Sequence, residues 1–296
     1  MHRKRWNAIH VLFELHPCSP LLVKSGTLSP NPSLPDMQFV RTQGPQGEEV
    51  FIPGSSLKGV FRSFTERVLR TFGGERLACD PLGKESCGRK KEVEDAAKQG
   101  NSALVYRESC LACKVYGHTR LRGRLSFTDA FPEGNWKTEI RYGVAISRLS
   151  GAVAVGPFDM EVLVEGHFVG SLLLENFEVW QLGLLGLTIR SLNEGLTRVG
   201  FGKSRGFGEV RMRVREMTVE MAKVAGLSPG ELWGAGAFAG DAERKAYGLR
   251  SDDRLKGIPE GAPRDLGVYV RTVYGPQEGQ EVLERAAECL GSFFGG

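Results

Sequence analysis

Residues 51–72, FIPGSSLKGVFRSFTERVLRTF, combine a glycine–serine turn with an amphipathic segment. Apolar side chains recur at i, i+3, i+4 and i+7, which predicts a helix over 55–72 with one face packed inward; they are Leu57, Val60, Phe61, Phe64, Val68 and Phe72. Pro53 and Gly54 precede the helix, and either Ser55 or Ser56 is expected to cap its first turn. Gly73-Gly74 is expected to end it.

Two cations lie in the first turns of this helix. Lys58 and Arg62 are four residues apart and therefore share a face. Free backbone N–H groups and the helix dipole favour an anion at the same end. The arrangement suits a phosphate, although an ordinary amphipathic helix with solvated basic residues would have the same pattern.

The composition describes a globular chain long enough to bury a sizeable core, with 296 residues, 41% hydrophobic and 25% charged. The net charge of +4 is mild, but basic residues cluster at 89–91, 120–124 and 211–215, as expected for a protein that binds an anionic polymer. No apolar run reaches membrane-spanning length and the first residues do not resemble a signal peptide, so we expect a cytoplasmic protein.

Periodicity along the chain predicts a β, α, β, β, α, β order. Alternation indicates strands at 6–15, 123–129 and 209–221, the last with a bulge at Arg215-Glu216. The runs 158–164 and 167–174, separated by Glu165-Gly166, are typical of a hairpin, and 177–190 has helical spacing. Residues 25–47 are expected to form a long loop. This order predicts an α+β protein with a ferredoxin-like core.

The remaining segments are expected to be additions to that core. The predicted core domain spans 1–222 and carries a cysteine-rich insertion at about 73–118. Residues 223–296 show weaker order, with a short helix near 280–290, and are expected to be a C-terminal extension.

Four of the six cysteines fall in the insertion, at Cys79, Cys87, Cys110 and Cys113. In a cytosolic protein this spacing favours metal over disulfides, and four thiolates would make a closed structural zinc site, with His118 as a substitute ligand. Four reduced cysteines without metal are the alternative. Cys18 and Cys289 are isolated and are expected to behave as small hydrophobic residues.

A glycine-rich loop, RVGFGKSRGFG, spans residues 198–208. Its Gly-Lys-Ser resembles a P-loop, but Thr197 stands where the first glycine should be, and the loop precedes a strand rather than a helix. Lys203, Ser204 and Arg205, with the backbone N–H groups around them, could still bind phosphates. A purely structural turn is the alternative.

Asp36 is the one carboxylate between Glu14 and Glu48. The strand-like segment 37–41 would hold it near the glycine–serine turn, where a carboxylate can bind a divalent ion or orient an attacking hydroxyl. A turn or surface aspartate is the default alternative. The histidines at 10, 16, 118 and 167 are scattered and form no recognisable catalytic arrangement.

Together these motifs resemble those of the RAMP superfamily, and more narrowly the repeated backbone subunit of type III CRISPR-Cas effector complexes. The resemblance covers residues 6–222 and rests on the order of four motifs: Ile52-Pro-Gly-Ser-Ser-Leu-Lys-Gly-x-x-Arg62, Cys110-x-x-Cys-x-x-x-Gly117, Glu139-Ile-Arg-Tyr-Gly-Val-Ala-Ile-Ser-Arg148 and Gly200-Phe-Gly-Lys-Ser-Arg-Gly-Phe-Gly208.

The resemblance implies a subunit that stacks with copies or paralogues along a guide crRNA in antiviral defence, beside other effector subunits. It implies guide contacts from Ser55, Ser56, Lys58, Arg62, Arg148, Lys203, Ser204 and Arg205, and a thumb-like hairpin near Leu149–Phe158. Asp36 falls where catalytic members carry the aspartate that promotes Mg²⁺- or Mn²⁺-dependent cleavage of target RNA, by setting a 2′-hydroxyl against its own phosphate. Zinc-bearing insertions also occur in part of the family.

Three functions therefore remain open. The leading hypothesis is a crRNA-binding backbone subunit that is also a metal-dependent endoribonuclease. A non-catalytic scaffold of the same complex is the second. A nuclease that processes guide precursors is the third, although the sequence shows no acid–base histidine near the phosphate-binding motifs.

Overall fold

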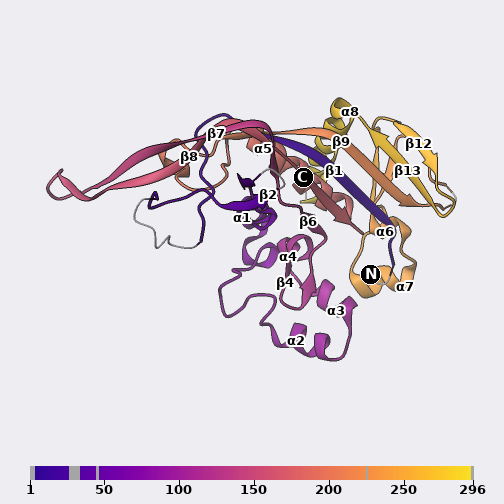
Figure 1. Ribbon diagram of the computed structural model, residues 1–296. Coiled ribbons are helices and arrows are strands. Elements are labelled where there is room, and N and C mark those ends of the chain that lie inside the picture. The colour runs from indigo at the N-terminus through magenta and orange to yellow at the C-terminus, as the bar shows by residue number, and fades with distance from the viewer. Residues whose placement is uncertain (1–3, 27–33, 45–46, 225, 295–296) are drawn as a thin grey trace.

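The computed structural model describes residues 4–26, 34–44, 47–224 and 226–294. Its centre is an antiparallel sheet in the order β12-β13-β9-β1-β8-β6, with the long strand β7 paired to β8. Figure 1 shows this sheet running across the molecule, with a long hairpin projecting from one end and the cysteine-bearing insertion on one side.

The core of the sheet is ferredoxin-like. In chain order it consists of β1 (Asn7–Pro17), α1 (Gly54–Leu77), β6 (Leu125–Phe127), β8 (Val153–Glu175), α5 (Val179–Asn193) and β9 (Val210–Ala222). The four strands lie in the order β9-β1-β8-β6, so the first and third are central neighbours. The predicted fold class is confirmed.

The alternation of apolar and polar side chains along each strand decides which face of the sheet packs against the core. In β1 the side chains of Ile9, Val11, Phe13 and Leu15 are fully buried, whereas His10 on the other face is exposed. In β9 the pairing with β1 passes from Leu12↔Glu216 to Phe13↔Val214, which leaves Arg215 unpaired. This irregularity is the predicted bulge, and it keeps apolar residues on the core face along the whole strand.

The prediction of a hairpin with its turn at Glu165-Gly166 is wrong. Residues 153–175 form one continuous strand, and the hairpin is made by β7 (Phe131–Ile146) and β8, with its turn at residues 147–152. Gly166 has φ +118° at a register shift between these strands, and a Cβ there would lie 2.9 Å from the Cβ of Trp136. The glycine therefore accommodates a bulge and a close cross-strand contact. The predicted thumb, 149–158, is the outer part of this longer hairpin.

Helix α1 begins at Gly54, one residue before the prediction, and breaks at Gly73-Gly74 as expected. Neither predicted serine cap forms, because the helix begins before both serines. Its N-cap residue is Pro53, which makes no side-chain cap bond. Instead Oδ1 of Asp129 accepts a 2.8 Å hydrogen bond from Gly54 N. The predicted buried face is confirmed at Leu57, Val60 and Phe61. It differs at the C-terminal end of the helix, where Leu69 is fully buried and Phe72 is 61% exposed.

The predicted loop 25–47 is more ordered than expected in its described second half. Met37 forms a parallel bridge with Met160, and β2 (Arg41–Gly44) pairs with β3 (Gly47–Val50). Phe51 N then bonds to Val40 O at 3.2 Å, and Ile52 bridges to Ala130. This path carries the chain from the base of the hairpin to the start of α1.

The insertion contains three short helices and a small hairpin, drawn below the sheet in Figure 1. They are α2 (Lys91–Lys98), α3 (Ser102–Arg107), α4 (Leu111–Tyr116), β4 (Gly117–His118) and β5 (Leu121–Arg122). Val115 and Tyr116 are buried in the main apolar core, so the insertion is packed onto the sheet domain.

The C-terminal segment shares the sheet of the core. β13 (Tyr269–Tyr274) pairs with β9, β12 (Ala262–Asp265) pairs with β13, and α8 (Pro276–Glu288) packs on α5. The connection contains β10 (Glu231–Trp233), α6 (Ala235–Phe238), α7 (Asp241–Tyr247) and β11 (Arg254–Lys256), and α9 (Leu290–Phe293) follows α8. Within the described ranges no helix is long and apolar enough to span a bilayer.

Candidate nucleic-acid interface and metal centre

The solvent face of α1 is a strip of small residues. Ser55, Gly59 and Ser63 are exposed and are spaced four apart, so they follow one another along the helix surface, and the exposed Arg67 lies one turn beyond them. The first turn sits close to the sheet, because a Cβ on Gly54 would lie 2.6 Å from Phe127 O. Because the exposed side chains of Ser55, Gly59 and Ser63 are small, a polymer backbone can approach this face of the helix closely.

Lys58 lies on one side of the strip, beside the insertion. Partial burial lowers the pKa of Lys58, and so do the neighbouring positive charges of Arg62 and Arg122. Among the described residues, no carboxylate forms an ion pair with Lys58. Arg62 is paired with Glu66 and Arg122 with Glu175, so Lys58 is the member of these three described cations that has no carboxylate partner. A lysine in this position, beside two other cations, favours the binding of an anion.

The glycine-rich loop lies on the other side. Gly200, Gly202, Gly206 and Gly208 all have positive φ, and a Cβ at Gly208 would lie 1.9 Å from Val199 O. The loop contains a 3₁₀ turn, η1 (Lys203–Arg205), and leads into β9, so it is not a P-loop, as the sequence predicted. Lys203, Ser204 and Arg205 are all exposed.

Arg67 of α1 lies near this loop. Partial desolvation by neighbouring atoms lowers the pKa of Lys203, and the nearby charge of Arg67 lowers it further. Lys58 and Arg67 are nine residues apart, which at 3.6 residues per turn places them on opposite sides of the helix. Lys58 therefore lies on one side of the small-residue strip of α1, and the glycine-rich loop with Lys203 lies on the other side, next to Arg67.

Asp36 lies at the base of the long hairpin. Its Oδ2 accepts a 3.1 Å hydrogen bond from Asp159 N in β8, and the side chain is exposed. Phe158, the preceding residue, lies 5.8 Å (ring centroid) from the guanidinium carbon of Arg205, so the glycine-rich loop reaches the same region. Asp36, Phe158 and Arg205 thus meet where the hairpin leaves the sheet.

Two other predicted RNA contacts are placed differently. Arg62 is already engaged: Nε bonds Glu66 Oε1 at 2.8 Å, Nη1 bonds Gly117 O at 3.0 Å, and Nη2 approaches Cys113 Sγ at 3.7 Å. It joins α1 to the insertion. Arg148 is exposed in the turn at the far end of the hairpin, away from α1.

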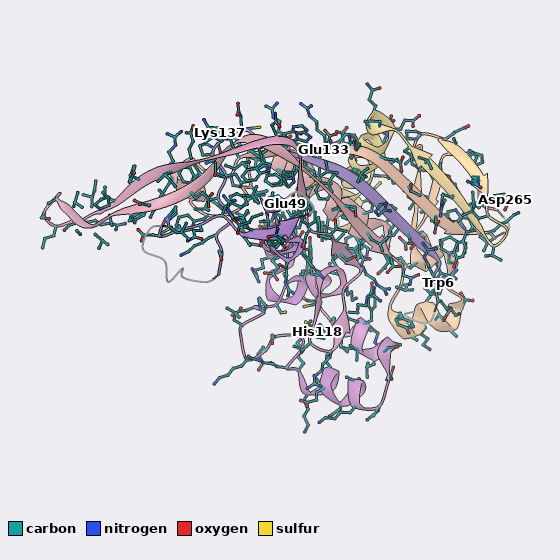
Figure 2. The ribbon with its side chains drawn as sticks, viewed as in Figure 1. Trp6, Glu49, His118, Glu133, Lys137 and Asp265 are labelled. Carbon is teal, nitrogen blue, oxygen red and sulfur yellow. The ribbon has the colours of Figure 1, made fainter. Side chains whose placement is uncertain are left out.

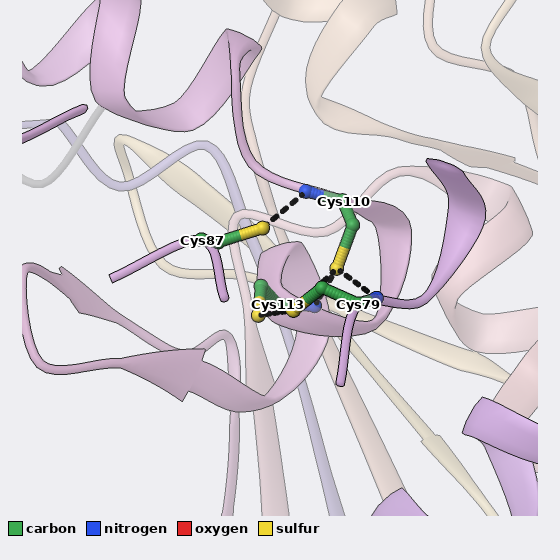
Figure 3. Close-up of side chains that lie close together, drawn as sticks. All are labelled: Cys79, Cys87, Cys110 and Cys113. Atoms are coloured by element: carbon green, nitrogen blue, oxygen red, sulfur yellow. Dashed lines mark hydrogen bonds between the residues drawn. The ribbon is translucent and has the colours of Figure 1, made fainter. Parts of the chain in front are cut away.

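The four cysteines of the insertion converge, as Figure 3 shows. The Sγ atoms of Cys79, Cys87, Cys110 and Cys113 are buried and all lie within 4.8 Å of one another. The Cys79–Cys113 and Cys79–Cys110 sulfur pairs are each 3.7 Å apart. Cys110 stands just before α4 and Cys113 in its first turn, and Tyr116 anchors this helix in the core.

This donor set fits a tetrahedral zinc ion. Zn–S bonds of about 2.3 Å imply sulfur–sulfur edges of about 3.8 Å, close to the two shortest pairs. Backbone N–H groups also point at the sulfurs, with Cys110 N 3.2 Å from Cys87 Sγ and Cys113 N 3.4 Å from Cys110 Sγ. Such N–H···S bonds orient thiolate ligands. His118 is not a member of the cluster, and its Nε2 lies 2.9 Å from Ser109 Oγ.

Residue-level reasoning on the sequence missed Arg67 and Arg122 as members of the cationic surface. Arg122 lay within a basic cluster already noted, at 120–124, but nothing local placed it beside Lys58. It also missed that His16 and His167 stack on the open face of the sheet, with ring centroids 5.1 Å apart. Their contact depends on the register of β1 against β8.

The fold and this surface define an α+β protein with a ferredoxin-like core and a cationic helix–loop face suited to a nucleic-acid backbone. The chain belongs to the RAMP superfamily, whose family model matches residues 14–211. Membership points to a CRISPR-associated role in crRNA binding, with RNA and the subunits of a CRISPR complex as the partners it implies. No curated protein matches the chain.

Proposed function

We propose that this chain is a backbone subunit of a type III CRISPR-Cas effector complex that binds guide crRNA and cleaves complementary target RNA. The observation that carries the binding half is the exposed strip of α1, bordered by Lys58 and Arg122 on one side and by Arg67 and Lys203 on the other. Cations on both sides of a strip of glycine and serine suit a sugar–phosphate backbone.

Within this proposal the hairpin and Asp36 act on the target strand. The outer hairpin exposes apolar side chains, among them Tyr142, Ile146 and Leu149, which can contact bases. Asp36 is fixed at its base by the bond from Asp159 N and would face a target nucleotide held there. Its role would be to position the 2′-hydroxyl that attacks the adjacent phosphate.

Among the residues that the structure describes, no complete protein site for the expected Mg²⁺ or Mn²⁺ lies near Asp36. Within the described ranges, the cysteine cluster is the one group of three or more metal-ligating side chains. A divalent ion at Asp36 would therefore need oxygen ligands from the RNA, and no catalytic step is assigned to it. This observation favours the second candidate, a crRNA-binding scaffold of the same complex without cleavage. A nuclease that processes guide precursors is the third candidate function.

Binding is tested by the salt dependence of RNA affinity. Lys58→Ala and Lys203→Ala are each expected to weaken binding of single-stranded RNA and to reduce the slope of log K against log salt by about 0.7 per lost phosphate contact. Arg285→Ala on α8 is the control, because Arg285 is exposed and its ion pair is with Glu288 on the same helix. Unchanged affinity and slope in both lysine variants would refute the RNA surface.

Cleavage is tested separately with Asp36→Ala in a reconstituted effector complex. The proposed enzyme loses target cutting while guide RNA still co-purifies with the variant. Unchanged cutting removes the enzymatic claim and leaves the scaffold. Cleavage of a guide precursor by the isolated chain in a chelator would instead favour the processing nuclease.

The cysteine cluster is proposed to hold one structural zinc ion. All four ligand positions are cysteines and all are buried, so no open position remains for substrate. The ion would keep the insertion, and with it Arg122, beside α1.

A further inference from the structure

A second cationic site lies at the end of the sheet where β1 begins, near Trp6 in Figure 2. It is a cavity of about 270 Å³ between the chain ahead of β1, the β5–β6 connection and the end of β8. Its walls carry four cations and one carboxylate; the lining residues are Lys4, Arg5, Arg122, Gly123, Arg124, Glu175 and Asn176.

Asn176 fastens the walls together in a strained conformation. Its φ is +48°, the one positive value outside glycine in the described part of the chain. Its Oδ1 accepts from Trp6 N at 2.8 Å, and its Nδ2 donates to Lys4 O at 2.8 Å. The side chain therefore holds the Lys4-Arg5 segment against the end of β8, and strain of this kind is common at binding sites.

The cations that line the cavity differ in how closely carboxylates are paired with them. Glu175 is shared, with Oε1 3.9 Å from Arg5 Nε and Oε2 3.6 Å from Arg122 Nη2. Lys4 and Arg5 have further carboxylates outside the lining, Glu243 and Glu220. The side chain of Arg122 is 76% exposed and its one long ion pair is with Glu175. Arg122 is therefore the cation most able to turn toward an incoming anion.

The cavity adjoins the α1 surface through Arg122. Strand β5 pairs Arg122 with Gly117 of β4, and the carbonyl of Gly117 accepts from Arg62, one helical turn after Lys58. Arg122 is close enough to contribute to the lowered pKa of Lys58. Cationic side chains therefore continue from Lys203 and Arg67, across α1 to Lys58, and on through Arg122 into the cavity.

We propose that this cavity binds a backbone phosphate of the same RNA strand, beyond the part held on α1, with Arg122 leaving Glu175 to contact it. The inference rests on the proposed RNA-binding function. The site would lengthen the bound segment of the strand without reading its sequence, because phosphate contacts carry no base information.

Two substitutions with opposite expected signs test it in the full-length protein. Arg122→Ala is expected to weaken binding of a long oligouridine, of about 24 nucleotides, by roughly three- to tenfold at low salt and to lower its salt slope by about 0.7. Glu175→Gln removes the carboxylate that competes with the phosphate and is expected to tighten binding. A short oligouridine of about six nucleotides, too short to span both sites, should bind equally to the wild type and to Glu175→Gln, because Glu175 lines the cavity and is not part of the α1 surface. Thermal unfolding shows whether each variant is folded.

The outcomes separate this inference from the proposed function. If Lys58→Ala and Lys203→Ala weaken binding while Arg122→Ala and Glu175→Gln do not change it, the cavity site is refuted and the α1 surface stands. If all four variants bind like the wild type, the proposed function itself fails. If both cavity variants weaken binding equally, the effect is structural rather than electrostatic, and the inference is overturned.

Discussion

The stability of the protein is expected to depend on the ionisation of one buried carboxyl, that of Asp253. Its Oδ1 accepts from Val179 N at 2.8 Å, in the first turn of α5, and its Oδ2 accepts from Gly236 N at 2.9 Å. Asp253 thus joins the C-terminal segment to a core helix. Burial, with the nearby charge of Glu178, raises the pKa of Asp253 to about 7.

The sign and size of the effect follow from this pKa. An unfolded aspartate loses its proton near pH 4, whereas the folded protein keeps it until about pH 7, so the native state binds the proton more tightly. The contribution is full below pH 4 and is lost as the pH rises through 7. Linkage gives a fall of about 2.5 kcal/mol in the free energy of unfolding between pH 5 and pH 8 from this group alone.

Asp253→Asn removes the titration and keeps the shape. At pH 5 the variant should be less stable than the wild type by ~1–3 kcal/mol, because its NH₂ group cannot accept from one of the two backbone N–H groups. The wild-type advantage should shrink by about 2.5 kcal/mol by pH 8. Urea unfolding of both proteins at pH 5, 6, 7 and 8, at constant ionic strength, measures this difference directly.

Taking the difference between the two proteins cancels the pH dependence of the cysteines and of the other shared groups that do not interact with Asp253. Asp241→Asn is the matched control, because Asp241 is exposed and paired with Arg244, and its substitution should leave the slope unchanged. A constant difference between the wild type and Asp253→Asn across the range would refute the reasoning. It would mean that the two N–H bonds keep Asp253 ionised despite burial.

Three further predictions concern the helices and the insertion. Chelation of zinc, or Cys113→Ser, should increase hydrogen exchange in residues 79–118 and leave the sheet protected; fresh, unchelated protein without zinc would contradict this prediction. Gly186→Ala should lower the free energy of unfolding by ~1–3 kcal/mol, because its Cβ would lie 2.2 Å from Leu283 O. An unchanged midpoint of denaturant unfolding would show that α8 can move away freely. Asp129→Ala should cost about 1 kcal/mol through loss of the bond to Gly54 N, with Asp129→Asn milder, and equal stabilities of all three proteins would exclude the cap.

The sequence by itself determined the features that depend on local period and spacing. Alternation located β1, β6 and β9, including the bulge at Arg215, because a buried face imposes a period of two on every strand that contributes to it. Helical spacing located α1 and α5. The order of these elements was enough to predict the ferredoxin-like core, since few topologies connect them without crossing.

The tertiary structure alone decided which distant residues meet. Asp129 caps α1, Arg67 and Arg122 join the cationic surface, and the C-terminal strands extend the sheet, and none of these has a local sequence signal. The glycines at 183 and 186, which weaken α5 as an isolated helix, are explained only by the close approach of α8. Each of these contacts depends on strand register and helix packing, which the whole core fixes at once and no short segment encodes.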